Sequence, residues 1–414
     1  MGIFSKKKPK ADNSLSTSKS IFWGGSTSGT FVNETAAMQT AAVYSCVRVI
    51  SEAVASLPIH IYRYEENGTK QMPGHSLHNI LHNAPNPEMT SFVFRETLMA
   101  HLLLWGNAYA QIIRNSAGRV TALYPLLPHK MDVWRGEDGE IYYTYWRNMD
   151  ESRLRDEAGG VTLRKDQVLH IPGLSFDGLV GYSPIALAKN AVGMAIATEN
   201  FGAAFFANGA NPGGVLEHPG SFGEKGIEKL RDAWDVIHKG AKNSGKVAVL
   251  EDGIKYHPIS VPPEQAQFLE TRKFQLNEIA RIFRVPPHMI GDLEKSSFSN
   301  IEQQALEFVK YCVNPWIIRW EQAMWQNLLL PSEQAGHFVK FNLDGLLRGD
   351  YETRMKGYSI GIQNGFFCPN DVRKLENMNE IPAEDGGFNY MVNGNMVKLA
   401  DVGAAYRRGQ QPNE

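Results

Sequence analysis

The chain has 414 residues, of which 43% are hydrophobic and 21% charged, a composition typical of a globular protein with more than one domain. Its 42 basic and 44 acidic residues leave a formal net charge of −2, which argues against a protein that holds nucleic acid tightly. The three cysteines are far apart and form no C-x-x-C pair, which argues against a disulfide framework and against a zinc cluster.

The N-terminal residues 1–30 are rich in Ser, Thr, Lys and Gly, and they predict a disordered tail without a secretory signal. A helix is expected over 34–57, with Val43, Val47, Ile50 and Val54 on one face. The strand 59–64 follows it, and Asn67-Gly68 predicts a hairpin turn.

A second helix should begin after Thr90, which is a good N-cap, and run to Trp105. The apolar stretch that contains this helix is broken by His101, Gly106 and Asn107, so it is too short to span a bilayer. Five β-branched and aromatic runs then predict a largely antiparallel meander: 108–115, 120–126, 130–135, 141–147 and 166–173.

Ser183-Pro184 combines an N-cap with a first-turn proline and predicts a long helix rich in Ala and Gly. Another long helix is expected over 264–284, with five side chains directed inward: Phe268, Leu269, Leu276, Ile279 and Phe283. The segment 211–262 lies between them and predicts a turn, a strand, a helix and a hairpin at Asp252-Gly253. This pattern indicates a small subdomain inserted between two paired helices.

The stretch "GAKNSGKV" has the G-x-x-x-x-G-K spacing of a phosphate-binding loop, from Gly240 to Lys246. Val247 replaces the hydroxyl that would hold Mg²⁺, and the order is helix, loop, strand instead of strand, loop, helix. Gly240 is also a natural helix C-cap. The stretch is therefore interpreted as a turn, and nucleotide binding is the alternative.

Further along the chain, Ser299 and Glu302 form a capping box for a helix in which Pro315 should produce a kink. Two short helices are expected around 351–365 and 368–378.

Catalytic or metal-binding patterns are not evident in the sequence. His75, His78 and His82 lie in one stretch without an acidic or cysteine partner, and they are interpreted as solvated helix-face residues. His170 could be a general base, but no nucleophile is specified beside it. Asp344 and Asp350 are interpreted as a cap and a turn residue. The sequence thus predicts neither catalytic residues nor a metal site or cofactor.

The residues from about 38 to 390 resemble the portal, or head–tail connector, proteins of long-tailed double-stranded DNA bacteriophages. The stretches "GNAYA" and "FRVPPHMIG…SN" carry most of this resemblance. Supporting stretches in the same order are "VYSCVRVISEAVASLPIHIYR", "LHNAPNP", "DGLVGYSPIALA", "GANPGGVLEHPG" and "NPWIIRWEQAMWQNLL".

The resemblance implies an α+β subunit of a ring, with a mixed α/β wing, two long stem helices, a small α/β clip and a helical crown. Its parts would be the disordered tail 1–30, wing 31–182, stem helix 183–210, clip 211–262, stem helix 263–285, tunnel loop 286–300, kinked helix and returning wing strand 301–343, and crown with C-terminal tail 344–414.

By the same resemblance, the protein is a dodecameric ring at one capsid vertex, which initiates procapsid assembly and forms the channel for DNA packaging and ejection. The implied partners are double-stranded DNA held non-specifically, the terminase large subunit, a head-completion or adaptor protein and the major capsid protein, with no membrane. The implied location is the virion, and the host cytoplasm during assembly. The tunnel loop would present Lys295, Ser296, Ser297 and Asn300 to DNA, and the clip would present Lys242, Lys246 and Asp252 to the motor.

Three interpretations therefore remain. A structural DNA conduit agrees with the near-neutral charge, because each neutralised phosphate adds affinity that opposes sliding. An enzyme acting on nucleotides through Gly240–Lys246 is opposed by Val247. A regulatory DNA-binding module is opposed by the lack of a basic recognition helix.

Overall fold

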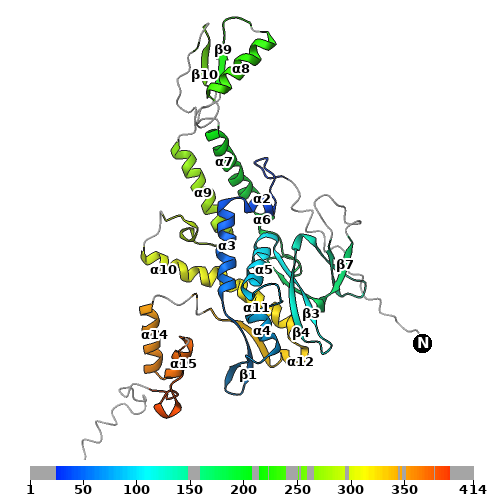
Figure 1. The fold of residues 1–414 in the computed structure, drawn as a ribbon, viewed down its shortest axis with the longest axis vertical. Coiled ribbons are helices and arrows are strands. Elements are labelled where there is room, and N and C mark those ends of the chain that lie inside the picture. The colour runs from blue at the N-terminus through cyan, green and yellow to red at the C-terminus, as the bar shows by residue number, and fades with distance from the viewer. Residues whose placement is uncertain are drawn as a thin grey trace, which may run out of the picture. The chain divides into compact units, whose positions relative to one another are not determined.

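The computed structural model describes residues 25–147, 159–207, 214–221, 223–238, 250, 253–258, 265–293, 298–343, 346, 351–376 and 378–391. These residues form an α+β fold that divides into two units, 1–342 and 343–414 (Figure 1). The helices and strands of the first unit surround one main hydrophobic core, and the second unit is small and helical.

Two helices replace the single helix expected over 34–57. Asn33 caps α2 (Glu34–Met38) by accepting the Ala36 N–H at 2.6 Å, and the chain turns at the buried, extended Thr40 before α3 (Ala41–Ser56). The predicted apolar face of α3 is confirmed, because Val43, Val47, Ile50 and Val54 are buried.

The first sheet combines distant parts of the chain in the order β11–β1–β2. β1 (Ile59–Glu65) and β2 (Gly68–Gln71) form the predicted hairpin, and Gly68 takes the positive φ that the turn requires. The other edge of β1 pairs antiparallel with β11 (His337–Phe341), so that Ile61 lies opposite Val339. Helix α4 (Ser76–His82) contacts β1.

Helix α5 (Ser91–Trp105) packs against α3 and begins after the predicted cap, Thr90, whose hydroxyl accepts the Val93 N–H. The expected meander is all antiparallel, but it divides into two three-stranded sheets. One has the order β4–β3–β8, from β3 (Asn107–Arg114), β4 (Val120–Leu126) and β8 (Val168–Pro172). The other has the order β5–β6–β7, from β5 (Met131–Arg135), β6 (Ile141–Trp146) and β7 (Gly160–Arg164). The sequence pattern did not predict β7.

The helix that begins at Ser183 is also interrupted. Ser183 caps α6 (Pro184–Leu187) as predicted, but Ala188 leaves helical geometry before α7 (Lys189–Ala207). Residues 25–30, expected in the disordered tail, contact α7 instead: Thr27 N–H donates to the Asn190 side chain, and Ser26 lies over Gly193. A Cβ at residue 193 would come 2.5 Å from Ser26, so glycine permits this contact.

Helices α7 and α9 (Gln265–Phe283) lie side by side (Figure 1). Of the side chains expected to face inward on α9, Ile279 and Phe283 are buried, but Leu269 is exposed. The expectation for Leu269 is wrong because no described part of the chain covers that side of α9. Phe268 lies where only the backbone is described.

Between α7 and α9, the chain forms β9 (Gly214–Glu217), helix α8 (Glu224–His238) and β10 (Lys255–Pro258). β10 pairs antiparallel with β9, and Trp234 of α8 stacks on Tyr256 of β10. The other strand of the hairpin predicted at Asp252-Gly253 lies outside the described residues, and so does the stretch Gly240–Lys246.

The helix expected to contain Pro315 is continuous from Phe298 to Leu328, with a π-helical segment just before the proline that the sequence did not predict. Helix α10 (Phe298–Glu307) already contains Ser299, so Ser299 is not the residue before the helix. A π-helical segment, Phe308–Val313, follows, and Pro315 lies in the first turn of α11 (Asn314–Leu328). The chain stays helical through Val313, so Pro315 follows a change from π-helical to α-helical hydrogen bonding and not a free helix start, and such a change is itself a known cause of a kink. Helix α12 (Pro331–Gln334) then leads into β11.

The main core lies where α3 packs against α5, α5 against β3, and α11 against β8 and β11. The Trp320 and Phe341 rings meet edge to face, 6.3 Å apart. The second unit contains the two helices predicted from sequence, α14 (Tyr351–Gln363) and α15 (Pro369–Leu375). Arg354 and Tyr358 of α14 both contact the Glu376 carboxylate.

Candidate functional site

Most of the residues predicted to contact DNA or a motor lie outside the described part of the chain. Lys295, Ser296 and Ser297 do so, as do Lys242, Lys246 and Asp252. Asn300 lies in α10, where the backbone alone is described. The site is therefore built from the residues around them: the junction that holds α6 and α7, the exposed faces of the paired helices, and the base of 286–300.

Three glycines meet at the junction where α5 ends and α6 begins. Gly106 ends α5 with a left-handed φ of 74°, and a Cβ there would lie 2.0 Å from the Tyr182 carbonyl oxygen. A Cβ on Gly181 would lie 2.0 Å from the Gly106 oxygen, and one on Gly173 would lie 2.8 Å from the same atom. Backbone therefore touches backbone at this point, and only glycine leaves room for it.

Asn107 connects the strand β3 to this junction. Its Oδ1 accepts the Gly181 N–H at 2.8 Å, and its Nδ2 donates to the Gly181 carbonyl at 2.7 Å. Oδ1 also accepts a bond from Nε2 of His170 at 3.0 Å, which fixes the tautomer of that ring. Nδ1 of His170 is then the acceptor for the Tyr143 hydroxyl at 3.3 Å.

Burial lowers the pKa of His170 to about 3, against a smaller opposite effect of Asp177. The ring is thus neutral and fully engaged, so the expectation that it could act as a general base finds no support in this geometry. His170 therefore has a structural role: it orients Asn107, which in turn holds Gly181.

Two further side chains hold α6 and the loop before it. The Ser183 hydroxyl accepts the Ala186 N–H at 3.1 Å and donates to the Leu104 carbonyl at 2.6 Å, so it caps α6 and ties that helix to α5. Arg319 of α11 donates to the carbonyls of Pro172 and Gly173 at 3.1 and 3.0 Å. The start of α6 is therefore fixed to α5, β3, β8 and α11.

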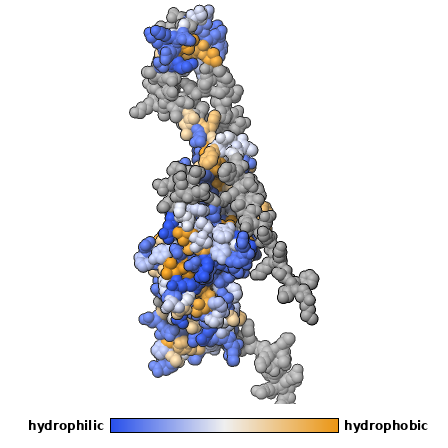
Figure 2. Space-filling model, turned by 90° about the vertical axis from the view of Figure 1, so that its right-hand side faces the viewer, coloured by the Kyte–Doolittle hydropathy of each residue, from blue (hydrophilic) through white to orange (hydrophobic). Residues whose placement is uncertain are grey.

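An apolar stripe runs along α6 and α7 on their exposed side. Met194 and Phe201 lie seven residues apart in α7, which places them on one face of that helix, and Leu187 lies in α6, before the break at Ala188. Leu187, Met194 and Phe201 are 48%, 43% and 52% exposed. Hydrophobic side chains are visible on the outside of the paired helices (Figure 2). Leu187 also lines an apolar hollow of about 480 Å³ with Leu174, Tyr182 and Trp316.

The base of the segment 286–300 is held against α9 and α10. Arg284 takes a left-handed φ of 58° at the end of α9, and the adjacent Phe283 carbonyl accepts a bond from Sγ of Cys312 at 3.3 Å. His288 Nδ1 lies 2.7 Å from Gln304 Oε1, and Asn277 Nδ2 donates to Asp292 at 3.2 Å. These contacts border a groove of about 830 Å³, and they hold the first part of the segment, up to Asp292, against α9 and α10.

The described cysteines are not suited to nucleophilic chemistry. All three are buried, and burial raises the pKa values of Cys46 and Cys312 to about 12, so these two thiols stay protonated.

The family model for phage portal proteins matches residues 41–377. The chain belongs to the phage portal protein family. It is 36% identical over 381 residues to the portal protein of Enterobacteria phage HK97, covering 90% of this chain and 86% of that protein. It is 35% identical over 384 residues to the probable portal protein of Streptomyces phage phiC31, covering 91% and 82%.

The portal fold is also found in a solved structure, the neck of a native gene transfer agent particle computed with C12 symmetry. The two chains share 23% identity and a TM-score of 0.55 over 84% of this chain and 93% of that one. As a phage portal protein, the chain is a virion component of the head–tail connector, and its family is structural. Among the described residues, no helix is long and apolar enough to cross a membrane.

The junction gives the portal motifs a physical meaning. "GNAYA" contributes Gly106 and Asn107, and "DGLVGYSPIALA" contributes Gly181 and the Ser183 cap. Both motifs can be recognised in the sequence, but nothing in their spacing predicts that they touch. The signal in the sequence that could have indicated this contact is that each motif places a glycine next to a polar residue at the end of a helix or strand.

Proposed function

We propose that the chain forms a dodecameric ring at one capsid vertex, through whose channel DNA is packaged and ejected. The observation that carries this proposal is the apolar stripe of Leu187, Met194 and Phe201 on a chain of the portal family. Exposed apolar side chains in a row favour contact with another protein surface. A neighbouring copy would cover them in a ring closed by a head-to-tail interface.

The likeness to a neck structure with C12 symmetry supports twelve subunits. In this ring, 31–182 and 301–343 would form the wing, 183–210 and 263–285 the stem, 211–262 the clip and 344–414 the crown. The fixed start of α6 supports this division, because a stem helix can transmit force only if its base is rigid.

Segment 286–300 would then be the tunnel loop, with Lys295, Ser296, Ser297 and Asn300 facing DNA. The net charge of −2 supports loose, non-specific contact with double-stranded DNA, since a strongly basic channel would retain phosphates by counterion release. The short neutral side chains of Ser296, Ser297 and Asn300 exchange hydrogen-bond partners easily, which also favours sliding.

The clip would receive the terminase large subunit through Lys242, Lys246 and Asp252, and later a head-completion or adaptor protein. The ring would also contact the major capsid protein and initiate procapsid assembly in the host cytoplasm. The family supports these roles, and the amphipathic α8, which has a charged face, offers a surface for such partners.

Ring formation is tested by native mass spectrometry and negative-stain imaging of the purified chain. The unmodified protein should give annular particles of one size. Met194→Glu combined with Phe201→Glu should give monomers with unchanged circular dichroism, because two charges would be buried in the interface. Tyr64→Glu, at an exposed apolar residue of β1 outside the stripe, is the matched control and should still give rings. A monodisperse monomer of the unmodified chain at micromolar concentration would contradict the proposal.

The alternative is a nucleotide-binding enzyme that uses Gly240–Lys246. An ATPase assay on the pure chain distinguishes this enzyme from a structural conduit. A conduit should show no turnover, and Lys246→Ala should change nothing in that assay while weakening motor docking. Turnover that disappears with Lys246→Ala would favour the enzyme.

A further inference from the structure

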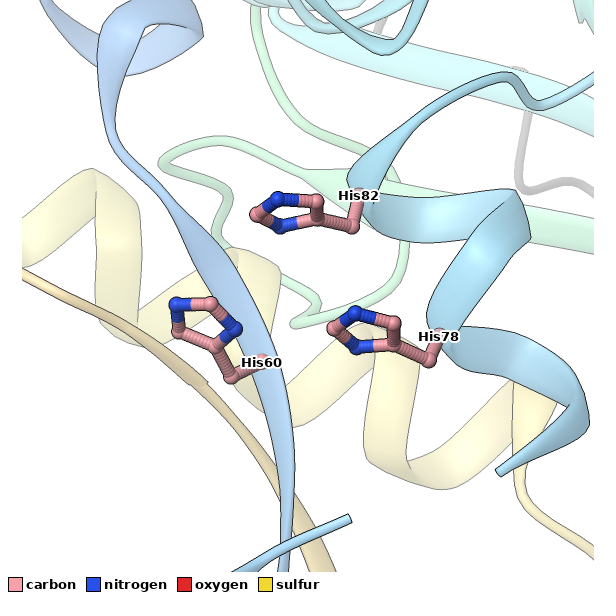
Figure 3. A group of neighbouring side chains, drawn as sticks. All are labelled: His60, His78 and His82. Atoms are coloured by element: carbon pink, nitrogen blue, oxygen red, sulfur yellow. The ribbon is translucent and has the colours of Figure 1, made fainter. Parts of the chain in front are cut away.

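Three histidines from two elements come together on one side of the first sheet. His78 and His82 are four residues apart, which places them on the same face of α4, and His60 faces them from β1 (Figure 3). One ring nitrogen from each lies within 4.8 Å of those of the other two, and all three side chains are half-buried. The expectation of solvated residues is therefore wrong, because β1 covers this face of α4.

His75 is not part of this group. Its Nδ1 accepts the Leu77 N–H and so caps α4, and its Nε2 lies 3.5 Å from the Glu333 carboxylate. No carboxylate or thiolate among the described residues belongs to the group of three.

The hydrogen bonding of His82 and His78 leaves at least one nitrogen of each ring free to bind a ligand. Nδ1 of His82 lies 3.1 Å from the Ile59 carbonyl, which can only accept, so that nitrogen carries the proton and Nε2 presents a lone pair. A histidine that binds a metal ion is commonly oriented in this way by a backbone carbonyl. Nδ1 of His78 is buried without a hydrogen-bond partner, an arrangement that requires an explanation.

The electrostatics favour the uncharged form of two of the rings, those of His60 and His78. Burial, and then the neighbouring His82 and His78, lower the pKa of His60, and burial followed by His82 and His75 lowers the pKa of His78. Neutral imidazole is the form that binds transition metals.

We propose that His60, His78 and His82 bind one divalent transition-metal ion of the class that prefers imidazole ligands, such as Zn²⁺. Three imidazoles select Zn²⁺, Cu²⁺ or Ni²⁺ over the oxygen-seeking Mg²⁺ and Ca²⁺. Because the site is half-buried, water can occupy a fourth position. The ion would join α4 to β1 and stabilise the first sheet. This inference is independent of the proposed channel function.

Binding requires a small movement of the rings. They are stacked nearly in parallel, at 13° between His78 and His82 and 27° between His60 and His82, so their lone pairs do not yet converge. Nitrogens in a tetrahedral zinc site are about 3.4 Å apart, since each Zn–N bond is about 2.1 Å. Rotation of the His60 and His78 rings about their Cβ–Cγ bonds would supply this change and would leave the bond from His82 to the Ile59 carbonyl in place. The Gln71 amide, whose Nε2 lies 2.7 Å from His60 Nδ1, can turn so that its Oε1 accepts a hydrogen bond from that nitrogen.

The test uses the untagged full-length chain. Equilibrium dialysis against micromolar Zn²⁺ should give one tightly bound ion per chain, and Co²⁺ should give the visible absorption of a tetrahedral site. His78→Gln should weaken Zn²⁺ binding at least tenfold. This variant is the most informative, because His78 Nδ1 has no hydrogen bond to lose.

His60→Gln should have the same effect, and circular dichroism reports whether each variant folds. His257→Gln is the matched control: it removes an exposed histidine of β10 and should leave the high-affinity ion in place. Absence of tightly bound Zn²⁺, or binding that is unchanged in a folded His78→Gln variant, would overturn the proposal.

Discussion

Gly106 is the residue on which the geometry of the junction depends most directly. Gly106→Ala should reduce the free energy of unfolding by more than about 4 kcal/mol, since the new Cβ would enter the Tyr182 carbonyl as well as strain the left-handed backbone. Urea denaturation measures this loss.

Gly139→Ala is the control for backbone strain alone. Gly139 has a φ of 84°, but no atom lies within 4 Å of the position that a Cβ would take, so alanine there should cost about 1–2 kcal/mol. Equal costs for the two substitutions would mean that the close approach at Gly106 is not a constraint.

His170 should make the stability of the chain sensitive to acid. Its pKa is about 3 in the folded protein and about 6.5 when unfolded, so the unfolded chain binds the proton first as the pH falls. The stabilisation is complete above about pH 6.5 and declines at up to about 1.4 kcal/mol per pH unit below it. Urea denaturation midpoints between about pH 6.5 and pH 4.5 should show this decline.

His170→Gln should make that decline less steep, although it also lowers stability at neutral pH. His257→Gln removes an exposed histidine and should leave the slope unchanged. An identical pH dependence in the His170 variant would contradict the assignment.

The π-helical segment Phe308–Val313, just before α11, is an element that the sequence did not predict. Pro315 is exposed and follows the π-helical segment, where the regular α-helical hydrogen bonding is already interrupted, so Pro315→Ala should change the free energy of unfolding by less than about 0.5 kcal/mol. Trp320→Ala, in the same helix but fully buried, should cost about 3–5 kcal/mol. Thermal and urea unfolding compare the two. A large effect of Pro315→Ala would mean that the proline itself determines the geometry of the helix.

Elements with local signals could be predicted from sequence. Thr90 and Ser183 cap the helices assigned to them, because a cap is decided by contacts within one turn. The hairpin at Gly68 is predicted by its turn residues for the same reason.

Features that depend on distant contacts could not be predicted. His60 meets His78 only because α4 packs against β1, and no spacing in the sequence records that packing. Gly106 and Gly181 touch for a similar reason. The break at Ala188 and the exposure of Leu269 are likewise not indicated by the periodicity of the sequence.

At the scale of the whole molecule, a substitution of Lys295 tests whether the proposed channel contacts DNA through this residue. Lys295→Ala should leave the size of the ring unchanged but alter packaging efficiency or the retention of packaged DNA, because one phosphate contact per subunit is lost. Complementation of a portal-deficient phage, with measurement of packaged genome, checks this outcome.

Lys70→Ala, on the exposed β1–β2 hairpin, is the control and should package normally. Replacing 294–300 with bulky side chains should obstruct DNA passage. A ring structure with Lys295 on the outer surface, away from the channel axis, would contradict the tunnel-loop assignment while leaving the family membership intact.

The pairing of β1 with β11 has a consequence for synthesis on the ribosome. Val339 completes the sheet around Ile61, yet β11 leaves the ribosome only after nearly all of the first unit has been made. At about 5–20 residues per second, β1 waits for tens of seconds with one edge unpaired, a state prone to aggregation. Nascent chains should therefore need protection by chaperones during this interval. Chains that end before β11 cannot complete the sheet, so we expect prematurely terminated subunits to be excluded from assembly.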